Sequence, residues 1–316
     1  MLTVLVATAR AAHCFTHHPE WDQFEVLGQQ LAKQTYRDFE LVVVSPFAPE
    51  AGRTLVRYVD RLTVVEPRST PWQRARLFAA ASARNTGLMH ARGAWVLVVD
   101  DCCEFEPDFL ERVIYYADRG FGVAVMYKRD GQIIDPRWAT FNQIAKGAEW
   151  IVIGEGGTVP YGFVSFPIDR AVAINGYDEL RFDGARGLED MNFARRLMHH
   201  GLKFVMDQRI MATLHDHLGY PEEVIDNENQ TARCCNTAHA LSQMGPANRT
   251  RYTAEEKQKI LNCMFWRADG KCGFHRFRHD CAYPKWAASG HPIARRILEN
   301  DEEELFDLAA ARQAVL

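Results

Sequence analysis

The stretch Trp95-Val96-Leu97-Val98-Val99-Asp100-Asp101 decides the fold of this chain. Five apolar residues in a row are typical of a strand that is buried on both faces, as the strands of a parallel sheet are. Similar apolar runs occupy 2–7, 39–44 and 62–65. Segments with apolar residues at helical spacing, such as 77–91, separate these runs. The alternation predicts an α/β fold in which helices flank a mostly parallel central sheet.

The composition narrows the class of protein. The chain has 316 residues, of which 47% are hydrophobic, so it can bury a large core. Its formal net charge of -4 shows no overall basic excess and does not indicate a nucleic-acid partner. The first residues lack the basic start of a signal peptide, and no transmembrane segment is expected because no apolar run is long enough. We therefore expect a cytoplasmic protein with reduced cysteines.

Asp100 and Asp101 directly follow the buried strand, at the edge where ligands bind in open α/β sheets. Carboxylate oxygens are the ligands that Mg²⁺ prefers, usually together with the phosphates of a substrate. The pair therefore favours a site that holds a nucleoside diphosphate through a divalent metal. The alternative is that the two aspartates only cap the turn after the strand, since acidic turn residues are common.

Two polar groups farther along the chain can contribute to such a site. Glu189 and Asp190 follow the glycine-rich run 184–187 and lie in the first turn of a predicted helix. A carboxylate at this place either complements the helix dipole or acts as a general base toward a hydroxyl group. His215 and His217 follow a predicted strand, where an imidazole either ligates a metal or is an ordinary surface residue.

Three stretches, in this order, resemble the inverting glycosyltransferases of family 2. The first is Ala83-Arg84-Asn85-Thr86-Gly87, followed by Ala91-Arg92-Gly93 and by the strand that ends in Asp100-Asp101. The second is Asn175-Gly176-Tyr177-Asp178-Glu179, and the third is Gly187-Leu188-Glu189-Asp190. The third is also similar to the galactosyltransferase-like families that share the GT-A fold. The resemblance covers 1–217 and implies a GT-A, Rossmann-like catalytic domain there. Residues 218–316 are expected to form a mainly helical and loop-like extension that either binds the acceptor or is stabilised by zinc.

The resemblance implies a one-step transfer with inversion. A hexose or N-acetylhexosamine would move from a nucleoside-diphosphate sugar to a hydroxyl group of an acceptor of unspecified class. Asp190 would be the general base, and Glu189 would position the acceptor. Mn²⁺ or Mg²⁺ would be held by Asp101 with His215, or less favourably with His217. The residues implied in donor binding are Thr8, Ala9 and Arg10 against the nucleotide base, together with Ser45, Arg84 and Asp100.

Two positions depart from the family pattern. Cys102 stands where the third position of the D-x-D motif holds an aspartate, and a thiol is a poor ligand for Mg²⁺ or Mn²⁺. Either Asp101 takes the metal by itself, or the dependence on a metal is weak. Ser45 stands where the family often has an acidic pair near the base, and it carries no charge. Uracil, and hence a UDP-sugar donor, is the interpretation that analogy with the family gives.

Aromatic and cysteine-rich segments leave further alternatives open. Tyr161 and Phe163 can stack on the sugar ring of an acceptor, although burial in the core is the commoner fate of such residues. In the extension, five residues are close enough in sequence for a structural zinc site, with reduced structural cysteines as the alternative. These residues are Cys263, Cys272, His275, His279 and Cys281.

Two other classes of protein fit parts of this sequence. A nucleotidyltransferase also binds a nucleotide with metal-bound carboxylates, but it usually has a glycine-rich loop after the first strand. Residues 7–13 contain no glycine, which disfavours this class. A non-catalytic, degenerate transferase-like binding module is favoured by Cys102 and disfavoured by the presence of Asp101 and Asp190.

Overall fold

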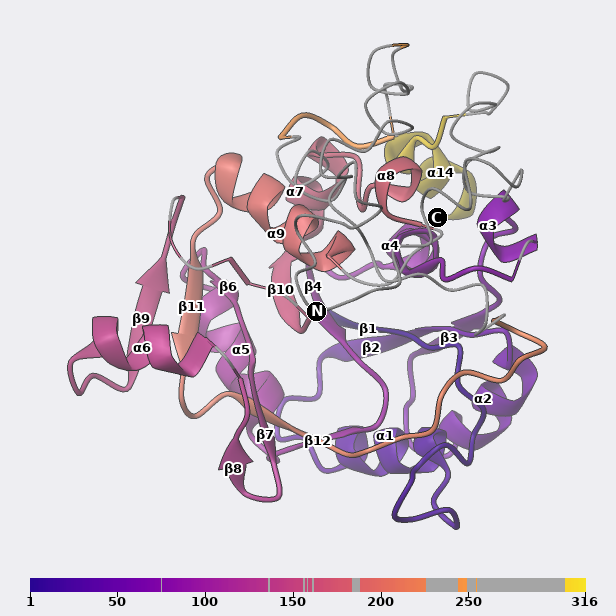
Figure 1. The fold of residues 1–316 in the computed structure, drawn as a ribbon, viewed down its shortest axis with the longest axis horizontal. Helices are drawn as coiled ribbons and strands as arrows, with labels where there is room; N and C mark the ends of the chain where they lie inside the picture. The colour runs from indigo at the N-terminus through magenta and orange to yellow at the C-terminus, as the bar shows by residue number, and fades with distance from the viewer. Residues whose placement is uncertain are drawn as a thin grey trace, which may run out of the picture.

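The computed structural model describes residues 1–225, apart from 75, 136, 156, 158, 161 and 184–187, and in addition 244–248, 254 and 305–316. These residues form an α/β fold with three sheets, and helices cover both faces of the largest sheet (Figure 1). The fold class expected from the sequence is thereby confirmed. Within the described ranges, no helix is long and apolar enough to cross a membrane.

Five strands form the central sheet: β1 (Leu2–Ala7), β2 (Phe39–Val44), β3 (Leu62–Val65), β4 (Trp95–Val99) and β10 (Val164–Pro167). Their order is β10-β4-β1-β2-β3. The first four along the chain pair in parallel, and β10 closes one edge antiparallel to β4. The continuous apolar runs therefore correspond to the inner, parallel part of the sheet.

Helices bury the two faces of this sheet in separate cores. One face is covered by α1 (Gln23–Ala32), α2 (Ala48–Leu55) and α5 (Phe109–Ala117). The other is covered by α4 (Ala80–His90), α7 (Ile168–Ala173) and α9 (Glu189–His199). Successive side chains of a strand point to opposite faces, so Val4 and Val6 of β1 lie in the first core and Leu5 lies in the second.

Two smaller sheets extend this framework. One has the order β6-β11-β9 and the other the order β5-β12-β7-β8. The pairing of β12 with β5 is antiparallel and brings the chain after β12 next to the end of β4: the amide of His215 donates to the carbonyl of Cys102 over 3.0 Å. The bounds are β5 (Cys103–Phe105), β6 (Gly122–Val123), β7 (Met126–Arg129), β8 (Gln132–Ile133), β9 (Trp150–Ile153), β11 (Phe204–Asp207) and β12 (Met211–Leu214).

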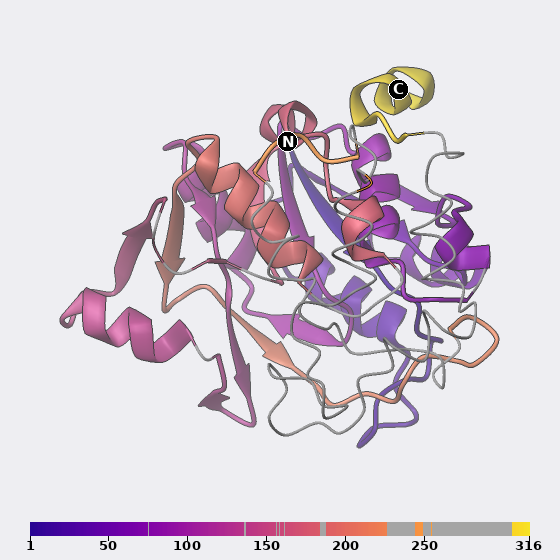
Figure 2. The same cartoon turned by 45° about the horizontal axis from the view of Figure 1, so that its top comes forward.

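The remaining described helices are α3 (Pro71–Arg74), α6 (Arg137–Ala145), α8 (Glu179–Phe182) and α14 (Leu308–Val315). α14 packs against α4, with Leu308 fully buried and its amide donating to Oδ1 of Asn175 over 2.8 Å. Figure 2 shows α14, in yellow, at the same end of the molecule as the N-terminus. Most of the expected helical extension, including all five residues of the expected zinc site, lies outside the described residues.

Glu40 of β2 connects β1 and the α4–β4 connection by hydrogen bonds, at the end of the sheet opposite the carboxyl ends of the parallel strands. Its side chain is buried, and Oε1 accepts hydrogen bonds from the hydroxyl of Thr3 and the amides of Arg92 and Gly93, over 2.6, 2.6 and 3.0 Å. A Cβ at Gly93 would lie 2.6 Å from the backbone nitrogen of Thr3. Only glycine therefore lets the α4–β4 connection approach β1 this closely.

Replacing Glu40 by alanine is expected to lower the free energy of unfolding by about 2–4 kcal/mol, because the Thr3 hydroxyl and the amides of Arg92 and Gly93 lose the buried oxygen that they share. Urea unfolding of Glu40→Ala and the wild type measures the difference. Glu40→Gln keeps an acceptor oxygen in place and is expected to retain most of the free energy of unfolding that Glu40→Ala loses. Equal stability of all three proteins would show that the Glu40 contacts are energetically neutral.

Candidate active site

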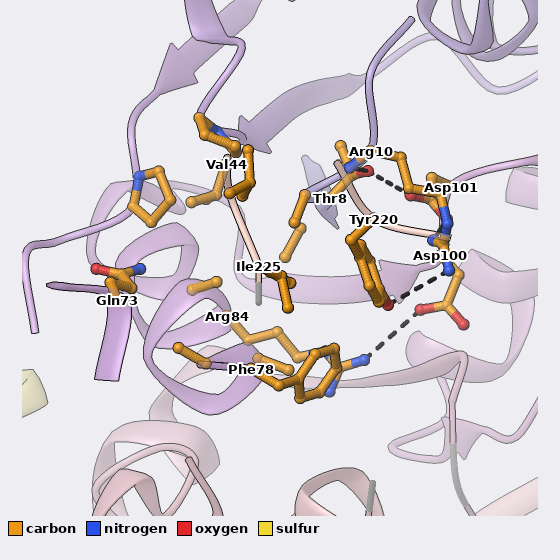
Figure 3. Close-up of a pocket in the computed structure, with 18 of the residues that line it drawn as sticks. Thr8, Arg10, Val44, Gln73, Phe78, Arg84, Asp100, Asp101, Tyr220 and Ile225 are labelled. Carbon is orange, nitrogen blue, oxygen red and sulfur yellow. Dashed lines mark hydrogen bonds and ion pairs between the residues drawn. The ribbon is translucent and has the colours of Figure 1, made fainter. Parts of the chain in front are cut away.

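A cavity of about 690 Å³ opens at the carboxyl ends of β1, β2 and β4 (Figure 3). It lies where open α/β sheets bind ligands, because the loops that leave adjacent parallel strands diverge there. The structure brings ten of the residues predicted from the sequence to its wall. They are Thr8, Ala9, Arg10, Arg84, Asp100, Asp101, Glu189, Asp190, His215 and His217.

Asp101 is held from two sides by residues that follow β1. Its Oδ1 lies 2.5 Å from Nη1 of Arg10, and its Oδ2 accepts a hydrogen bond from the hydroxyl of Thr8. Only 6% of the Asp101 side chain is exposed. Both carboxylate oxygens of Asp101 are therefore engaged within the protein.

Asp100 faces the cavity instead. Of its side chain, 48% is exposed, and Oδ1 lies 3.6 Å from Nη2 of Arg84. Desolvation within the site raises the pKa of Asp100, and the neighbouring Asp101 adds to this, whereas Arg84 acts in the opposite direction. Asp100, rather than Asp101, is thus the member of the pair that a ligand in the cavity can reach.

Arg84 joins the end of β4 to the start of α9. Besides Asp100 it contacts Glu189, whose Oε1 accepts from Nη1 over 2.5 Å, and both side chains are buried. Burial alone would lower the pKa of Arg84, but Glu189 first, and Asp100 and Asp190 after it, hold the pKa above its ordinary value. The guanidinium therefore stays charged and fixes the two acidic segments relative to each other.

Asp190 lies in the first turn of α9 beside Glu189. Its Oδ2 accepts from the amide of Gly162 over 2.6 Å, and its Oδ1 accepts from the amide of Met191 over 2.7 Å. Desolvation, reinforced by the charge of Glu189, raises the pKa of Asp190 to about 6. A carboxylate on a cavity wall with a pKa near neutrality is suited to accept a proton from a bound hydroxyl group.

The predicted metal ligands do not converge. Among the described residues, no group of three His, Cys, Asp or Glu side chains is placed to hold a metal ion. Nε2 of His215 lies 3.5 Å from Glu104, its ring packs edge-on against Phe15 and Trp21, and His217 is exposed. With both oxygens of Asp101 engaged, these donors do not fit the octahedral oxygen shell of Mg²⁺.

Cys102 adds no ligand for such an ion. Its sulfur lies 3.1 Å from the sulfur of Cys14, and both residues are buried against Phe15. A thiol in an apolar cluster is a soft and poorly placed donor for Mn²⁺ or Mg²⁺.

Two predicted residues lie away from the cavity and one is not described. Ser45 is fully buried, and its hydroxyl accepts from the amide of Phe47 over 3.1 Å, so it does not line the cavity. Phe163 is also fully buried, with its ring edge-on to that of Tyr127, and offers no surface to an acceptor. Tyr161 lies outside the described residues.

Sequence reasoning missed the aromatic wall of the cavity. Phe78 and Tyr220 line it, with ring centres 5.8 Å apart, and Ile225 lies nearby. The expected domain boundary at 217 separated Tyr220 from the site, and Phe78 stood at the start of a predicted core-facing helix. The motif Gly219-Tyr220-Pro221, an aromatic residue between two turn formers, was the available signal.

The stretch Gly176-Tyr177-Asp178-Glu179 does not line the cavity, but it is hydrogen-bonded to Asn85 of α4, the helix that carries Arg84. Nδ2 of Asn85 donates to the carbonyl of Tyr177 over 2.9 Å and to Glu179 over 2.8 Å, while Oδ1 of Asn85 accepts from the amide of Tyr177 over 2.8 Å. A Cβ at Gly176 would lie 2.3 Å from Oδ1 of Asn85. The stretch therefore locks α4 in place, and with it Arg84.

Residues 18–161 match the family model described as glycosyl transferase family 2. The match covers somewhat less than half of the chain and includes α4, β4 and the aspartate pair. It agrees with the family that the sequence motifs indicated. No curated protein matches the chain in sequence.

Among solved structures, the chain is similar to crystal structures of TarS from S. aureus. One has a TM-score of 0.49 at 14% identity and covers 93% of this chain and 55% of that chain, so this chain spans little more than half of its length. A structure of TarS 1–349 in complex with UDP has a TM-score of 0.47 at 14% identity, covering 95% of this chain and 90% of that chain.

Replacing Arg84 by methionine is expected to lower the free energy of unfolding by about 3–5 kcal/mol, because Glu189 is left buried without its cation. Thermal or urea unfolding provides the measurement. The double variant Arg84→Met/Glu189→Gln also removes the negative charge of Glu189. It is therefore expected to recover a large part of the lost free energy of unfolding. A double variant no more stable than Arg84→Met would contradict a coupling between the two side chains.

Proposed function

We propose that this protein is an inverting glycosyltransferase that moves a hexose or N-acetylhexosamine from a UDP-sugar to a hydroxyl group of an acceptor. The family match over 18–161 supports transfer of a sugar. The observation that carries the proposal is Asp190, which lines the donor cavity with its pKa raised to about 6. A base of this pKa on the wall of a nucleotide-sized cavity is what activation of an acceptor hydroxyl requires.

The uridine fits the end of the cavity formed after β2. Val44, Pro46 and Pro67 give this end apolar walls on which a base ring can lie. Glu66 offers an acceptor for the N–H of uracil, and Gln73, whose Oε1 accepts from the amide of Thr70 over 3.2 Å, has its amide NH₂ left for a carbonyl of the base. The diphosphate would then extend toward the end of β4, where Arg10, Arg84 and Asp100 lie.

The sugar would occupy the space between Asp100 and Asp190. The acceptor oxygen attacks the anomeric carbon from the side opposite the diphosphate, while Asp190 takes the hydroxyl proton. The bond between that carbon and the diphosphate oxygen breaks, and its electron pair leaves with UDP. A single displacement of this kind inverts the configuration at the anomeric carbon. The amides of Gly162 and Met191 hold the Asp190 carboxylate in a fixed orientation for this step.

Asp190→Asn is expected to lower kcat by about 10²–10⁴-fold, because the amide cannot accept the proton. The donor site is unchanged, so thermal stabilisation by UDP should persist. The assay measures UDP released from a panel of UDP-hexoses and UDP-N-acetylhexosamines, with water or an added sugar as acceptor. Asp169→Asn, the same change at an exposed first-turn position of α7, is the matched control. A wild-type rate in Asp190→Asn would rule out the base assignment.

The pH dependence of kcat/KM should show an acid limb near pH 6. The raised pKa of Asp190, about 6, means that the carboxylate is protonated and inactive below this pH and available above it. Activity is therefore expected to rise with pH through about 6 and then to level off. The limb should be missing from the residual activity of Asp190→Asn. A profile that is flat from pH 4.5 to 7, a range set by about 1.5 units below and 1 above that pKa, would contradict this assignment.

A further inference from the structure

Arg10 has hydrogen-bond donors beyond the one that Asp101 uses. Its Nη2 donates to the phenol oxygen of Tyr220 over 3.3 Å, and the guanidinium carbon lies 4.6 Å from the centre of the Tyr220 ring. Its Nε is buried and has no hydrogen-bond partner. Unsatisfied buried donors are rare in folded proteins, and one on a cavity wall points to an acceptor that a ligand supplies.

The position of Arg10 suits the phosphates of a donor. β1 and β4 are adjacent and parallel, so Arg10 leaves the sheet beside Asp100 and Asp101. Figure 3 shows Arg10 and Arg84 on opposite sides of Tyr220, both next to the aspartate pair. Arg84 is already shared between Asp100 and Glu189, whereas Arg10, beside Asp101, keeps one donor, Nε, without a partner.

We infer that the guanidinium of Arg10, and not a bound divalent metal, neutralises the charge that develops on the departing diphosphate. The inference rests on the proposed function. It is carried by two observations together: the predicted metal donors do not converge, and Arg10 lies at the end of β4 with an unpaired donor. A planar guanidinium can bind two phosphate oxygens at once, which suits it to this task.

No proton needs to move at Arg10. Burial by itself would lower the pKa of Arg10, but the charge of Asp101, the neighbouring Tyr220 and the hydrogen bond to Asp101 together hold the pKa above the ordinary value. As the bond between the anomeric carbon and the diphosphate oxygen breaks, that oxygen receives the electron pair. N–H groups of Arg10 then form charge-assisted hydrogen bonds to the diphosphate. Thr8 and Asp101 keep the arginine in place, so they act as positioning residues.

The first test compares UDP release from UDP-sugars by the full-length wild type in EDTA and in MnCl₂. We expect the rate in EDTA to lie within about threefold of the rate in Mn²⁺, well below the roughly 10²-fold or larger effect of losing an electrostatic catalyst. A rate that EDTA abolishes and Mn²⁺ restores would overturn the role of Arg10 and leave the proposed function standing. No UDP release under either condition, from any donor of the panel, would instead contradict the proposed function.

The second test removes the guanidinium of the Arg10–Asp101 ion pair and measures the rate in EDTA. Arg10→Ala is expected to lower kcat by about 10²–10³-fold with a smaller change in KM, and added guanidinium chloride should restore part of the rate. Arg61→Ala, which removes an exposed arginine paired with Asp38 over 2.7 Å, is the control and should keep the wild-type rate. A wild-type kcat in Arg10→Ala would overturn the inference.

The variant Asp101→Asn independently distinguishes a role of Asp101 in positioning Arg10 from a role as a metal ligand. If Asp101 only positions Arg10, the amide keeps a hydrogen-bonding oxygen, and kcat in EDTA should fall by no more than about tenfold, a loss worth about 1.4 kcal/mol. If Asp101 is a metal ligand, the variant loses nearly all activity and its stimulation by Mn²⁺. The Asp101→Asn variant and the EDTA comparison decide between Arg10 and a divalent metal even if Arg10→Ala does not fold.

Discussion

The parallel pairing of β1 with β4 is the constraint on which the whole site depends. In this register Val6 lies opposite Val99, so the residues that follow the two strands leave the sheet side by side. Thr8 and Arg10 therefore meet Asp101 although more than ninety residues of chain separate them. A one-residue slip would turn every side chain of β1 to the other face and break these contacts, so the two cores that fix the register also fix the site.

The framework could be predicted from the sequence because its strands are buried on both faces. The apolar runs at 2–7, 39–44, 62–65 and 95–99 coincide with β1 to β4. The strands of the smaller sheets are shorter: β6 and β8 have two residues each, and β6 pairs with β11, far along the chain. Local propensity carries little information about strands that short, since tertiary contacts decide them.

For the candidate site, the sequence indicated which residues gather but not which atoms face the cavity. The end of the buried strand predicts Asp100 and Asp101 at one edge of the sheet, and the family resemblance adds Asp190 to them. It could not show that Arg10 and Thr8 occupy both oxygens of Asp101 and leave Asp100 exposed, because that depends on side-chain orientation across distant segments. For the same reason Ser45, at the end of β2, was predicted in the site although its hydroxyl caps a local turn.

The contact between α14 and α4 has a consequence for the order in which the protein can assemble. Leu308 is fully buried near Asn85, and the guanidinium of Arg312 donates to the carbonyl of Leu88. α4 carries Arg84, yet part of its packing surface is supplied by residues more than two hundred positions later. During translation, which proceeds from the N-terminus, the contacts of α4 with Leu308 and Arg312 can form only after these residues have left the ribosome. The helix that organises the acidic residues is among the last to be fully packed.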